Sequence, residues 1–177
     1  MNPYLELHRS LEGRPELALE MRKRLIWAFS WAVPSDEAIA EIARAGSVLE
    51  VGAGSGYWAW LLSRAGARVR AVDSEPHQAP RWHEIHAPDP EAERAFAAHT
   101  LLLCWPPLDS PMSLEALRAH AARGGRRVYY VGEWRGRTAD TAFHDALERD
   151  WRRTATIEIP CWPGFEDRLY GFESKVG

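Results

Sequence analysis

The chain has 177 residues, a formal net charge of −3 at pH 7, 46% hydrophobic residues and 27% charged residues. This length and composition suit one globular domain and exclude fibrous or wholly disordered folds. No apolar run approaches the roughly 18–20 residues of a membrane-spanning helix, and the amino-terminal stretch lacks the apolar core of a secretory signal. The slightly acidic charge balance provides no basic field for nucleic acid. We therefore expect a cytoplasmic protein with no nucleic-acid or membrane partner, and the oligomeric state stays open.

The first 45 residues have the pattern of helices. Pro15 suits the first turn of a helix, and Leu17, Met21 and Leu25 follow it at helical spacing. Ser35 is a typical N-cap residue for a second helix. We expect these helices to pack on the functional site or to cover it.

The next segment follows the order strand, glycine-rich turn, helix, strand, acid. Strand patterns cover Ser47–Val51 and Arg68–Val72, and a helical pattern covers Tyr57–Arg64. The turn at residues 52–56 reads Gly-Ala-Gly-Ser-Gly, and Asp73 follows the second strand. This order is typical of the opening of a doubly wound parallel sheet.

The remaining chain predicts a short irregular segment and then a regular alternation. Between Ser74 and His99, prolines at 76, 80, 88 and 90 exclude a long helix, leaving a short strand near Trp82–His86 and a turn or two of helix near Glu91–Ala97. Later strands are expected at Thr100–Cys104, Arg127–Val131, Thr154–Ile159 and Arg168–Phe172. Later helices are expected at Ser113–Ala122, with Ser113 as N-cap, and at Ala139–Arg149. The last two strands suit an antiparallel pair at one edge of a mixed sheet.

The glycine-rich turn lets the backbone approach a ligand closely, with helix N–H groups pointing outward. A dinucleotide fingerprint requires a third glycine where this chain has Tyr57, and Gly56 comes one place early. The pattern therefore favours a ligand without a pyrophosphate. Asp73 lies 21 residues after Gly52, a spacing that suits a carboxylate accepting hydrogen bonds from ribose. A turn that binds nothing is the structural alternative.

Residues 48–56, Val-Leu-Glu-Val-Gly-Ala-Gly-Ser-Gly, resemble motif I of the class I S-adenosylmethionine-dependent methyltransferases. The resemblance extends from Ser30 to Phe172. More narrowly, residues 29–34, 56–58 and 103–107 resemble those of small bacterial methyltransferase-like proteins of undefined substrate. The resemblance implies a Rossmann-like, doubly wound, mostly parallel seven-stranded α/β sheet with an antiparallel edge strand and an N-terminal helical segment. It also implies a single domain over residues 1–177 and S-adenosylmethionine as the cofactor.

The resemblance also implies a role for each matched residue. The backbone of the turn would hold the methionine part of the cofactor, with Glu50 beneath it near the amino group and Asp73 on the ribose. The segment after the fourth strand would lie beside the transferred methyl. The implied cofactor-binding residues are Glu50, Gly52, Ala53, Gly54, Gly56, Tyr57, Asp73, Ser74, Cys104 and Trp105.

Two departures from the family pattern affect the expected chemistry. Amino-group methyltransferases often carry Asp or Asn, two prolines and an aromatic residue after the fourth strand. Here Trp105 and Leu108 take the polar and aromatic positions, although Pro106 retains its carbonyl, and this disfavours methylation of a base amine. The helix that usually follows the second strand is missing or very short, so the adenine wall is expected from the proline-rich segment, with Asp89 as a candidate contact.

Tryptophans follow three predicted strand ends, where open α/β sheets bind ligands. An aromatic pocket there would suit a flat or cationic small molecule, and the same indoles could instead fill the open end of a small domain. Polar candidates at the same end are Asp109, Glu133 and Asp167. The expected substrate-binding residues are Trp31, Trp105, Pro106, Trp134 and Trp162.

Methyl transfer from a sulfonium needs positioning, and a base where the nucleophile carries a proton. Glu133 is the best placed of three candidate bases, ahead of His86 and His144. His83 and His86 lack an evident third ligand, so no metal site is expected, and two cysteines predict no disulfide framework. The expected function is S-adenosylmethionine-dependent N- or O-methylation of a small molecule. The alternatives are a cofactor-binding protein without methyl transfer, a nicotinamide-dependent oxidoreductase, and methylation of protein or RNA.

Overall fold

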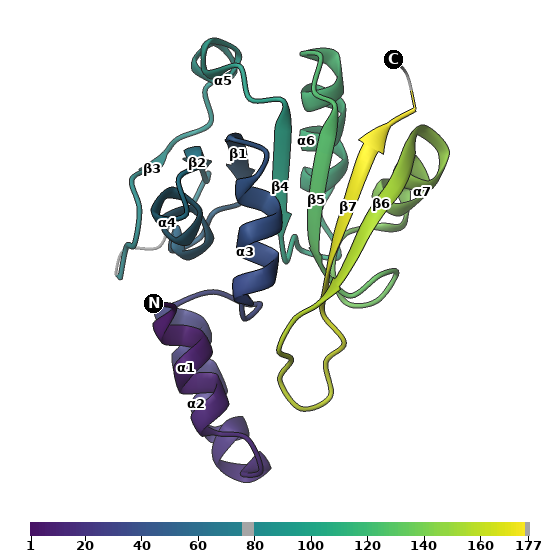
Figure 1. Ribbon diagram of the computed structural model, residues 1–177. Coiled ribbons are helices and arrows are strands. Elements are labelled where there is room, and N and C mark those ends of the chain that lie inside the picture. The colour runs from purple at the N-terminus through teal and green to yellow at the C-terminus, as the bar shows by residue number, and fades with distance from the viewer. Residues whose placement is uncertain (76–79, 176–177) are drawn as a thin grey trace.

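The computed structural model describes residues 1–75 and 80–175, so Pro76 of the proline-rich segment lies outside the described residues. Its seven-stranded sheet has the order β3-β2-β1-β4-β5-β7-β6 (Figure 1). The strands are β1 (Ser47–Val51), β2 (Arg68–Val72), β3 (Ile85–His86), β4 (Thr100–Cys104), β5 (Arg127–Gly132), β6 (Trp151–Glu158) and β7 (Arg168–Ser174). The helices are α1 (Pro3–Ser10), α2 (Pro15–Ala28), α3 (Asp36–Ala43), α4 (Tyr57–Arg64), α5 (Pro90–Phe96), α6 (Met112–Ala122) and α7 (Thr141–Asp150).

The strand pairing confirms the predicted fold class. Strands β1 to β5 pair in parallel, and β7 pairs antiparallel with both β5 and β6. The predicted bounds of β1, β2, β4 and α4 agree with the structure residue for residue. Strand β6 differs, because it begins at Trp151 directly after α7 rather than at Thr154.

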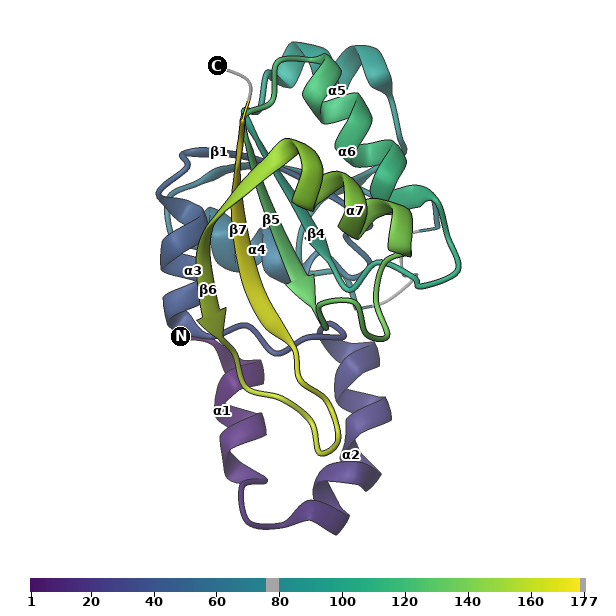
Figure 2. The ribbon, with the colours of Figure 1, turned by 90° about the vertical axis from the view of Figure 1, so that its right-hand side faces the viewer.

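Helices cover both faces of the sheet, and each face buries its own core (Figures 1 and 2). Alternate residues of a strand point to opposite faces. On β4, Leu102 belongs to the core beneath α3 and α4, whereas Leu101 and Leu103 belong to the core beneath α6 and α7. Strand β5 divides in the same way, with Tyr129 on the first face and Tyr130 on the second. The sheet therefore has the burial on both faces that parallel strands require.

Helix α6 begins differently from the prediction, whereas α3 begins as expected. The Ser35 hydroxyl caps α3 by accepting a hydrogen bond from the Ala38 N–H at 3.1 Å. Helix α6 starts one residue before Ser113, directly after Pro111, whose fixed φ suits the start of a helix. Ser113 is therefore not the cap. Its side chain is fully buried, and its hydroxyl has no hydrogen-bond partner within residues 1–75 and 80–175.

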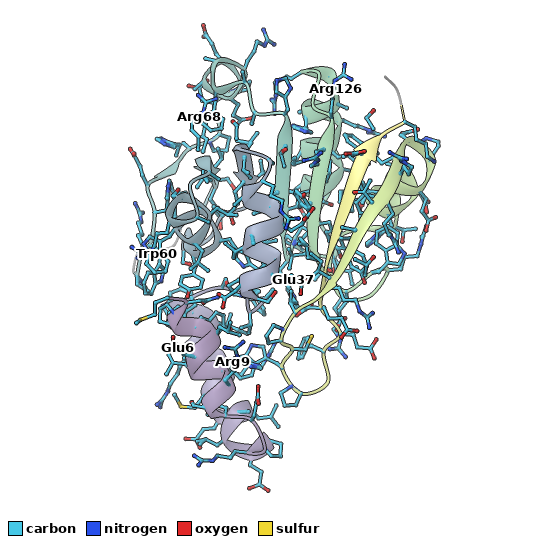
Figure 3. The ribbon with its side chains drawn as sticks, viewed as in Figure 1. Glu6, Arg9, Glu37, Trp60, Arg68 and Arg126 are labelled. Carbon is cyan, nitrogen blue, oxygen red and sulfur yellow. The ribbon has the colours of Figure 1, made fainter. Side chains whose placement is uncertain are left out.

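Helices α1 and α2 form a hairpin beyond the carboxyl ends of the parallel strands (Figures 1 and 2). Arg68 and Arg126 lie at the opposite end of the sheet, where β2 and β5 begin (Figure 3). Tyr4 fastens the hairpin, because its ring stacks on Phe29 at 4.7 Å and its hydroxyl accepts a hydrogen bond from the Trp162 indole at 3.2 Å. Within the described residues, no helix is long and apolar enough to cross a membrane.

Candidate functional site

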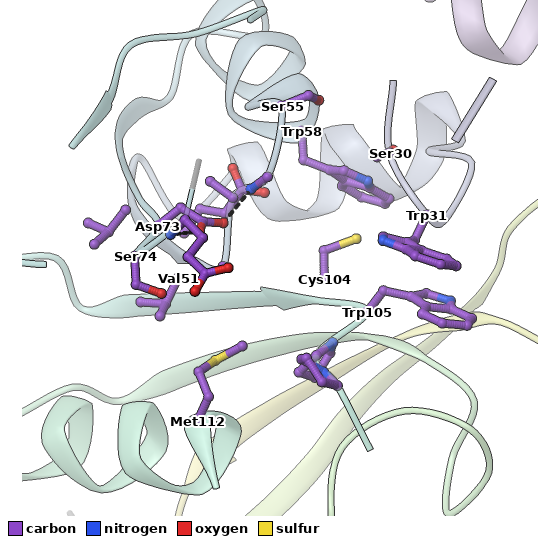
Figure 4. A pocket seen from close by; sticks show the side chains of 18 of the residues that line it. Ser30, Trp31, Val51, Ser55, Trp58, Asp73, Ser74, Cys104, Trp105 and Met112 are labelled. Atoms are coloured by element: carbon purple, nitrogen blue, oxygen red, sulfur yellow. Dashed lines mark hydrogen bonds between the residues drawn. The ribbon is translucent and has the colours of Figure 1, made fainter. Parts of the chain in front are cut away.

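A cavity of about 400 Å³ opens at the carboxyl ends of β1, β2 and β4 (Figure 4). The glycine-rich turn and Asp73 form one end of it, and Trp31 and Trp105 form the other. Ile26 and Phe29 extend the wall from the N-terminal helices, and Met112 closes it from α6. Open α/β sheets bind their ligands at this place.

The backbone of the glycine-rich turn requires glycine at two positions in particular. Gly52 and Gly56 have φ angles of 77° and 75°, in the left-handed region that side chains disfavour. A Cβ at Gly52 would lie 3.1 Å from the Met112 methyl, and one at Gly56 would lie 3.0 Å from the His83 Cβ. Gly52 lines the cavity together with Ala53 and Gly54. Gly56 does not line it and serves instead as the N-cap of α4.

Asp73 holds the turn in place and faces the cavity at the same time. One carboxylate oxygen accepts the Gly54 N–H at 2.7 Å, and the other accepts the Glu75 N–H at 2.8 Å (Figure 4). Each oxygen of an ionised carboxylate can accept a second hydrogen bond. The side chain can therefore still receive two hydroxyl groups, as a ribose would require. Ser74 lines the cavity beside it.

Glu50 lies beneath the turn with only 1% of its surface exposed. Burial raises the pKa of its carboxyl to about 8, although a hydrogen bond with the backbone of Ala59 opposes that shift. Its Oε2 atom has no hydrogen-bond partner among the described residues. Leaving a buried acceptor unpaired costs stability, so this oxygen suits a donor such as an ammonium group that arrives with a ligand.

Trp58 is a cavity residue to which the sequence analysis assigned no role. It is the second residue of α4, it is 1% exposed, and its indole N–H has no hydrogen-bond partner in the part of the chain that the structure describes. The cavity therefore has an unpaired acceptor at Glu50 and an unpaired donor at Trp58. This pair suits the ammonium and carboxylate groups of an amino acid. The available signal was its position in the first turn after the glycines, where a side chain comes close to a bound ligand.

Two tryptophans form the other end of the cavity. Trp31 and Trp105 stack nearly parallel, with ring centroids 4.8 Å apart and an interplanar angle of 10° (Figure 4). Trp105 has a φ of 53°, which is unusual for a bulky residue, and its indole N–H donates to Asp167 at 2.8 Å. Burial raises the pKa of Asp167 to about 6, against the effect of that hydrogen bond. The Pro106 carbonyl, which also lines the cavity, accepts the Ala139 N–H at 2.9 Å.

Cys104 lines the cavity between the turn and the tryptophan pair (Figure 4). Burial raises the pKa of its thiol well above the ordinary value, and the nearby Glu50 and Asp167 carboxyls add to the shift. The thiol is therefore neutral at physiological pH and is unsuited to be a nucleophile. Within residues 1–75 and 80–175, no three side chains cluster as metal ligands.

Three aromatic residues predicted for the site do not line the cavity. The Tyr57 hydroxyl donates to Asn2 at 2.8 Å and helps to hold α1. Trp162 is 2% exposed and packs against His8, with ring centroids 4.9 Å apart. Trp134 turns onto the face of α7, where it contacts the His144 ring at 4.7 Å, because the chain turns back directly after β5.

Glu133, which the sequence predicts as the catalytic base, does not line the cavity either. Its carboxylate accepts backbone N–H groups from Arg137 at 3.2 Å and from Glu166 at 3.0 Å. It thereby connects the loop after β5 with the loop between β6 and β7.

The other predicted polar candidates also lie outside the cavity. His144 is 1% exposed on the α7 face, and His86 ends β3 without lining the cavity. Asp89 caps α5 by accepting the N–H of Glu91 at 3.0 Å, while the adjacent Pro88 lines the cavity. Asp109 is exposed in the loop before α6. Several polar residues that were predicted for the site from their position in the chain thus have another role, because they cap a helix or are buried in the core.

Comparisons with known proteins identify the fold and go no further. No family model and no curated protein matches the sequence. A protein from Klebsiella pneumoniae, provisionally assigned as an O-methyltransferase, is 13% identical, with a TM-score of 0.57 over 96% of this chain and 94% of that chain. Magnesium protoporphyrin IX methyltransferase from Synechocystis PCC 6803, with bound S-adenosylhomocysteine, is 14% identical, with a TM-score of 0.51 over 79% of this chain and 81% of that chain.

A third similar structure comes from Streptococcus pneumoniae and is provisionally assigned as a tRNA methyltransferase in complex with S-adenosyl-L-methionine. It is 12% identical, with a TM-score of 0.53 over 78% of this chain and 71% of that chain. The chain therefore has the fold of the class I S-adenosylmethionine-dependent methyltransferases. The resemblance predicted from the residues around the glycine-rich turn is confirmed at the level of fold.

Proposed function

We propose that the protein is an S-adenosylmethionine-dependent methyltransferase that acts on a small molecule. The observation that carries this proposal is the unpaired, buried carboxyl oxygen of Glu50 beneath a glycine-rich turn at the cavity. Glu50 would hold the cofactor's ammonium group, Trp58 its carboxylate and Asp73 its ribose hydroxyls. When bound, the cofactor supplies a methyl group on a positively charged sulfur.

The protein's own contribution would be positioning and exclusion of water. In-line displacement at a methyl carbon depends mainly on holding the two reacting atoms at near-attack distance. The rings of Trp31, Trp58 and Trp105 enclose one end of the cavity, and these rigid side chains would limit the orientations of an acceptor. A dry aromatic wall also strengthens every electrostatic interaction within the cavity.

The charge of the cavity supports a small-molecule substrate over a nucleic acid. The ionisable carboxyl groups that line it belong to Glu50, Asp73 and Glu75. Carboxylates repel a phosphate backbone, whereas nucleic-acid sites neutralise phosphates with Lys and Arg. The described part of the cavity wall contains neither Lys nor Arg.

A second candidate function is cofactor binding without methyl transfer. Two hydrogen bonds favour it, because they occupy groups beside the expected methyl position. The Pro106 carbonyl accepts the Ala139 N–H at 2.9 Å, and the Trp105 indole donates to Asp167 at 2.8 Å. A regulator, or a catalyst of another reaction, would not need these two groups to be free for a methyl acceptor.

Calorimetric titration with S-adenosylmethionine, S-adenosylhomocysteine and NADH tests the assignment of the cavity. Both sulfur ligands should bind in the micromolar range, and NADH should give no heat. The Glu133→Gln variant is the matched control, since Glu133 lies outside the cavity, and its affinities should equal those of the wild type. Absence of binding of both sulfur ligands to the folded protein would refute the proposal.

Production of S-adenosylhomocysteine separates the two candidate functions. A panel of small-molecule acceptors is incubated with the protein and S-adenosylmethionine, and the S-adenosylhomocysteine formed is quantified by mass spectrometry. Product that depends on both protein and acceptor supports the methyltransferase. Tight cofactor binding with no product across the panel supports the second candidate.

A further inference from the structure

Among the described residues, the acceptor end of the cavity offers no base to remove a proton. The described lining residues include no His, Lys, Arg or Tyr. Their carboxyl groups are those of Glu50, Asp73 and Glu75, and the Cys104 thiol is neutral because its pKa is raised by burial. An acceptor that depends on these described residues alone would therefore need a lone pair that is already free.

The carboxyl groups lie at the other end of the cavity, with the glycine-rich turn. Asp73 accepts two backbone N–H groups there, and one of them is the N–H of Glu75, which places Glu75 at that end too (Figure 4). Glu50 lies beneath the glycine-rich turn, where the proposed function uses it for the cofactor's ammonium group. Asp167, the acid beside Trp105, does not line the cavity and already accepts the indole N–H.

We propose that the methyl acceptor is a neutral, pyridine-type nitrogen of a flat heteroaromatic molecule, so that the product is a cation. This inference rests on the proposed function. The nitrogen lone pair forms the new bond to the methyl carbon, and the carbon–sulfur bond breaks with its electron pair left on sulfur. The sulfonium becomes a neutral thioether, the positive charge moves to the product nitrogen, and no proton is released.

Charge and shape both support this class of acceptor. A cationic acceptor would be repelled by the positive sulfur, whereas a neutral acceptor would not. After transfer, the new cation would face an acidic lining and the electron-rich rings of Trp31 and Trp105, which favour cations. The two rings stack on each other with centroids 4.8 Å apart, and this aromatic stack at the cavity is one that a flat molecule could extend.

Binding of three bicyclic probes of similar size tests the inference. N-methylquinolinium is the cation, 1-methylnaphthalene is neutral, and 1-naphthoate is the anion. Each is titrated by ligand-observed NMR into protein with and without saturating S-adenosylhomocysteine. The cation should bind about tenfold more tightly than the neutral probe, and the anion should bind most weakly.

Two tryptophan variants locate the effect. Trp31→Ala should lower the affinity for N-methylquinolinium about tenfold, and Trp31→Phe should restore most of it because an aromatic face remains. Trp27→Ala is the matched control, since Trp27 is 58% exposed on α2 and does not line the cavity. It should leave the affinity unchanged.

A paired activity assay tests the reaction itself. Quinoline should give N-methylquinolinium and S-adenosylhomocysteine, whereas 1-naphthol, which must lose a proton, should give no product. Preferred binding of the anion, or turnover of 1-naphthol alone, would overturn the inference while cofactor binding left the proposed function standing. Absence of S-adenosylhomocysteine binding would overturn both.

Discussion

Glu50 is the residue whose environment departs furthest from that of its neighbours in the cavity. Its carboxyl is 1% exposed and has one oxygen without a hydrogen bond, whereas the Asp73 carboxylate accepts two backbone N–H groups. The two side chains lie at the ends of adjacent strands, and yet only Glu50 is fully buried with one oxygen left unpaired among the described residues. We therefore expect substitutions of the two acids to have different effects.

The stability of the protein should depend on pH through Glu50. Burial raises its pKa from 4.5 to about 8 in the folded state, so between these values the folded protein holds a proton that the unfolded chain has lost. The free energy of unfolding should therefore fall as pH rises from 4.5 to 8, by an amount on the order of 1 kcal/mol per pH unit at most. Urea unfolding of wild type and Glu50→Gln at pH 5 and pH 8 measures it.

The Glu50→Gln variant should lose most of this dependence and should be the more stable of the two at pH 8. Glu20→Gln, at an exposed position on α2, is the control and should follow the wild type. Parallel pH profiles for wild type and Glu50→Gln would contradict the assignment of the raised pKa to this residue.

Asp73→Ala should weaken the binding of S-adenosylmethionine. The substitution removes a charged acceptor from the cavity and releases the Gly54 N–H, and a hydrogen bond to a charged group contributes about 1.5–3 kcal/mol. The dissociation constant should therefore rise roughly 10- to 100-fold by calorimetry. The dissociation constant of Asp73→Asn, which keeps one acceptor oxygen, should lie between those of the wild type and Asp73→Ala. Unchanged affinity in a folded Asp73→Ala variant would remove Asp73 from the site.

At the scale of elements, α3 and α6 show that a serine near the start of a helix need not be its N-cap. The Ser35 hydroxyl accepts an N–H of the first turn of α3, whereas the Ser113 hydroxyl is buried inside α6 without a partner. Pro111 shifts the start of α6 and so takes Ser113 out of the capping position.

Two serine-to-alanine substitutions should consequently have opposite effects. Ser35→Ala should lower the free energy of unfolding by about 1 kcal/mol, the usual contribution of an N-cap. Ser113→Ala should leave it unchanged or raise it, because a buried hydroxyl without a partner disappears. Urea unfolding of both variants gives the comparison. Equal destabilisation by the two would show that Ser113 has a partner in solution.

The same elements show what the sequence could predict. Strands β1, β2 and β4 are short apolar runs followed by turn residues, so their bounds were predicted residue for residue. The start of β6 was not predicted correctly, for two reasons. Helix α7 passes into the strand at Trp151 without a turn residue between them. Arg152 and Arg153 are exposed on an edge strand that has no apolar alternation. Edge strands lack the buried pattern that identifies central ones.

The residues predicted for the site likewise divide into those that the sequence placed correctly and those that it did not. Glu50, the glycine-rich turn and Asp73 lie on two adjacent parallel strands, so the sequence order alone brings them together. Trp134 and Trp162 also follow strand ends, but that position does not determine the direction of the loop. Trp134 packs on His144 of the next helix, and Trp162 packs on Tyr4, 158 residues away, so both indoles lie away from the cavity. Those contacts could not be predicted from local pattern.

At the scale of the whole molecule, Glu133 joins two loops that belong to different parts of the sheet. It accepts an N–H of Arg137 in the loop after β5 and an N–H of Glu166 in the loop between β6 and β7. It contacts neither the glycine-rich turn nor the cavity. Its role is to position the antiparallel edge of the sheet relative to the parallel strands.

Glu133→Ala should therefore destabilise the fold without changing the cavity. Loss of a largely buried acceptor leaves two N–H groups without a partner, which should lower the free energy of unfolding by about 1–3 kcal/mol. Affinity for S-adenosylmethionine should stay within twofold of the wild-type value. Denaturation and calorimetry on one preparation test both halves, and a large loss of affinity in the folded variant would return Glu133 to the site.

The bond between Tyr4 and Trp162 spans 158 residues, and it fixes the order in which the molecule can be completed. Tyr4 leaves the ribosome early, but its partner Trp162 follows only after the strands of all four parallel pairings have been made. Contacts this distant form late, because the chain must first pay the entropy of a long loop. A nascent chain can thus have a folded glycine-rich turn while Phe29, which lines the cavity and stacks on Tyr4, is not yet fixed in place. The strands beneath the glycine-rich turn can therefore pair before the N-terminal hairpin is fastened beside them.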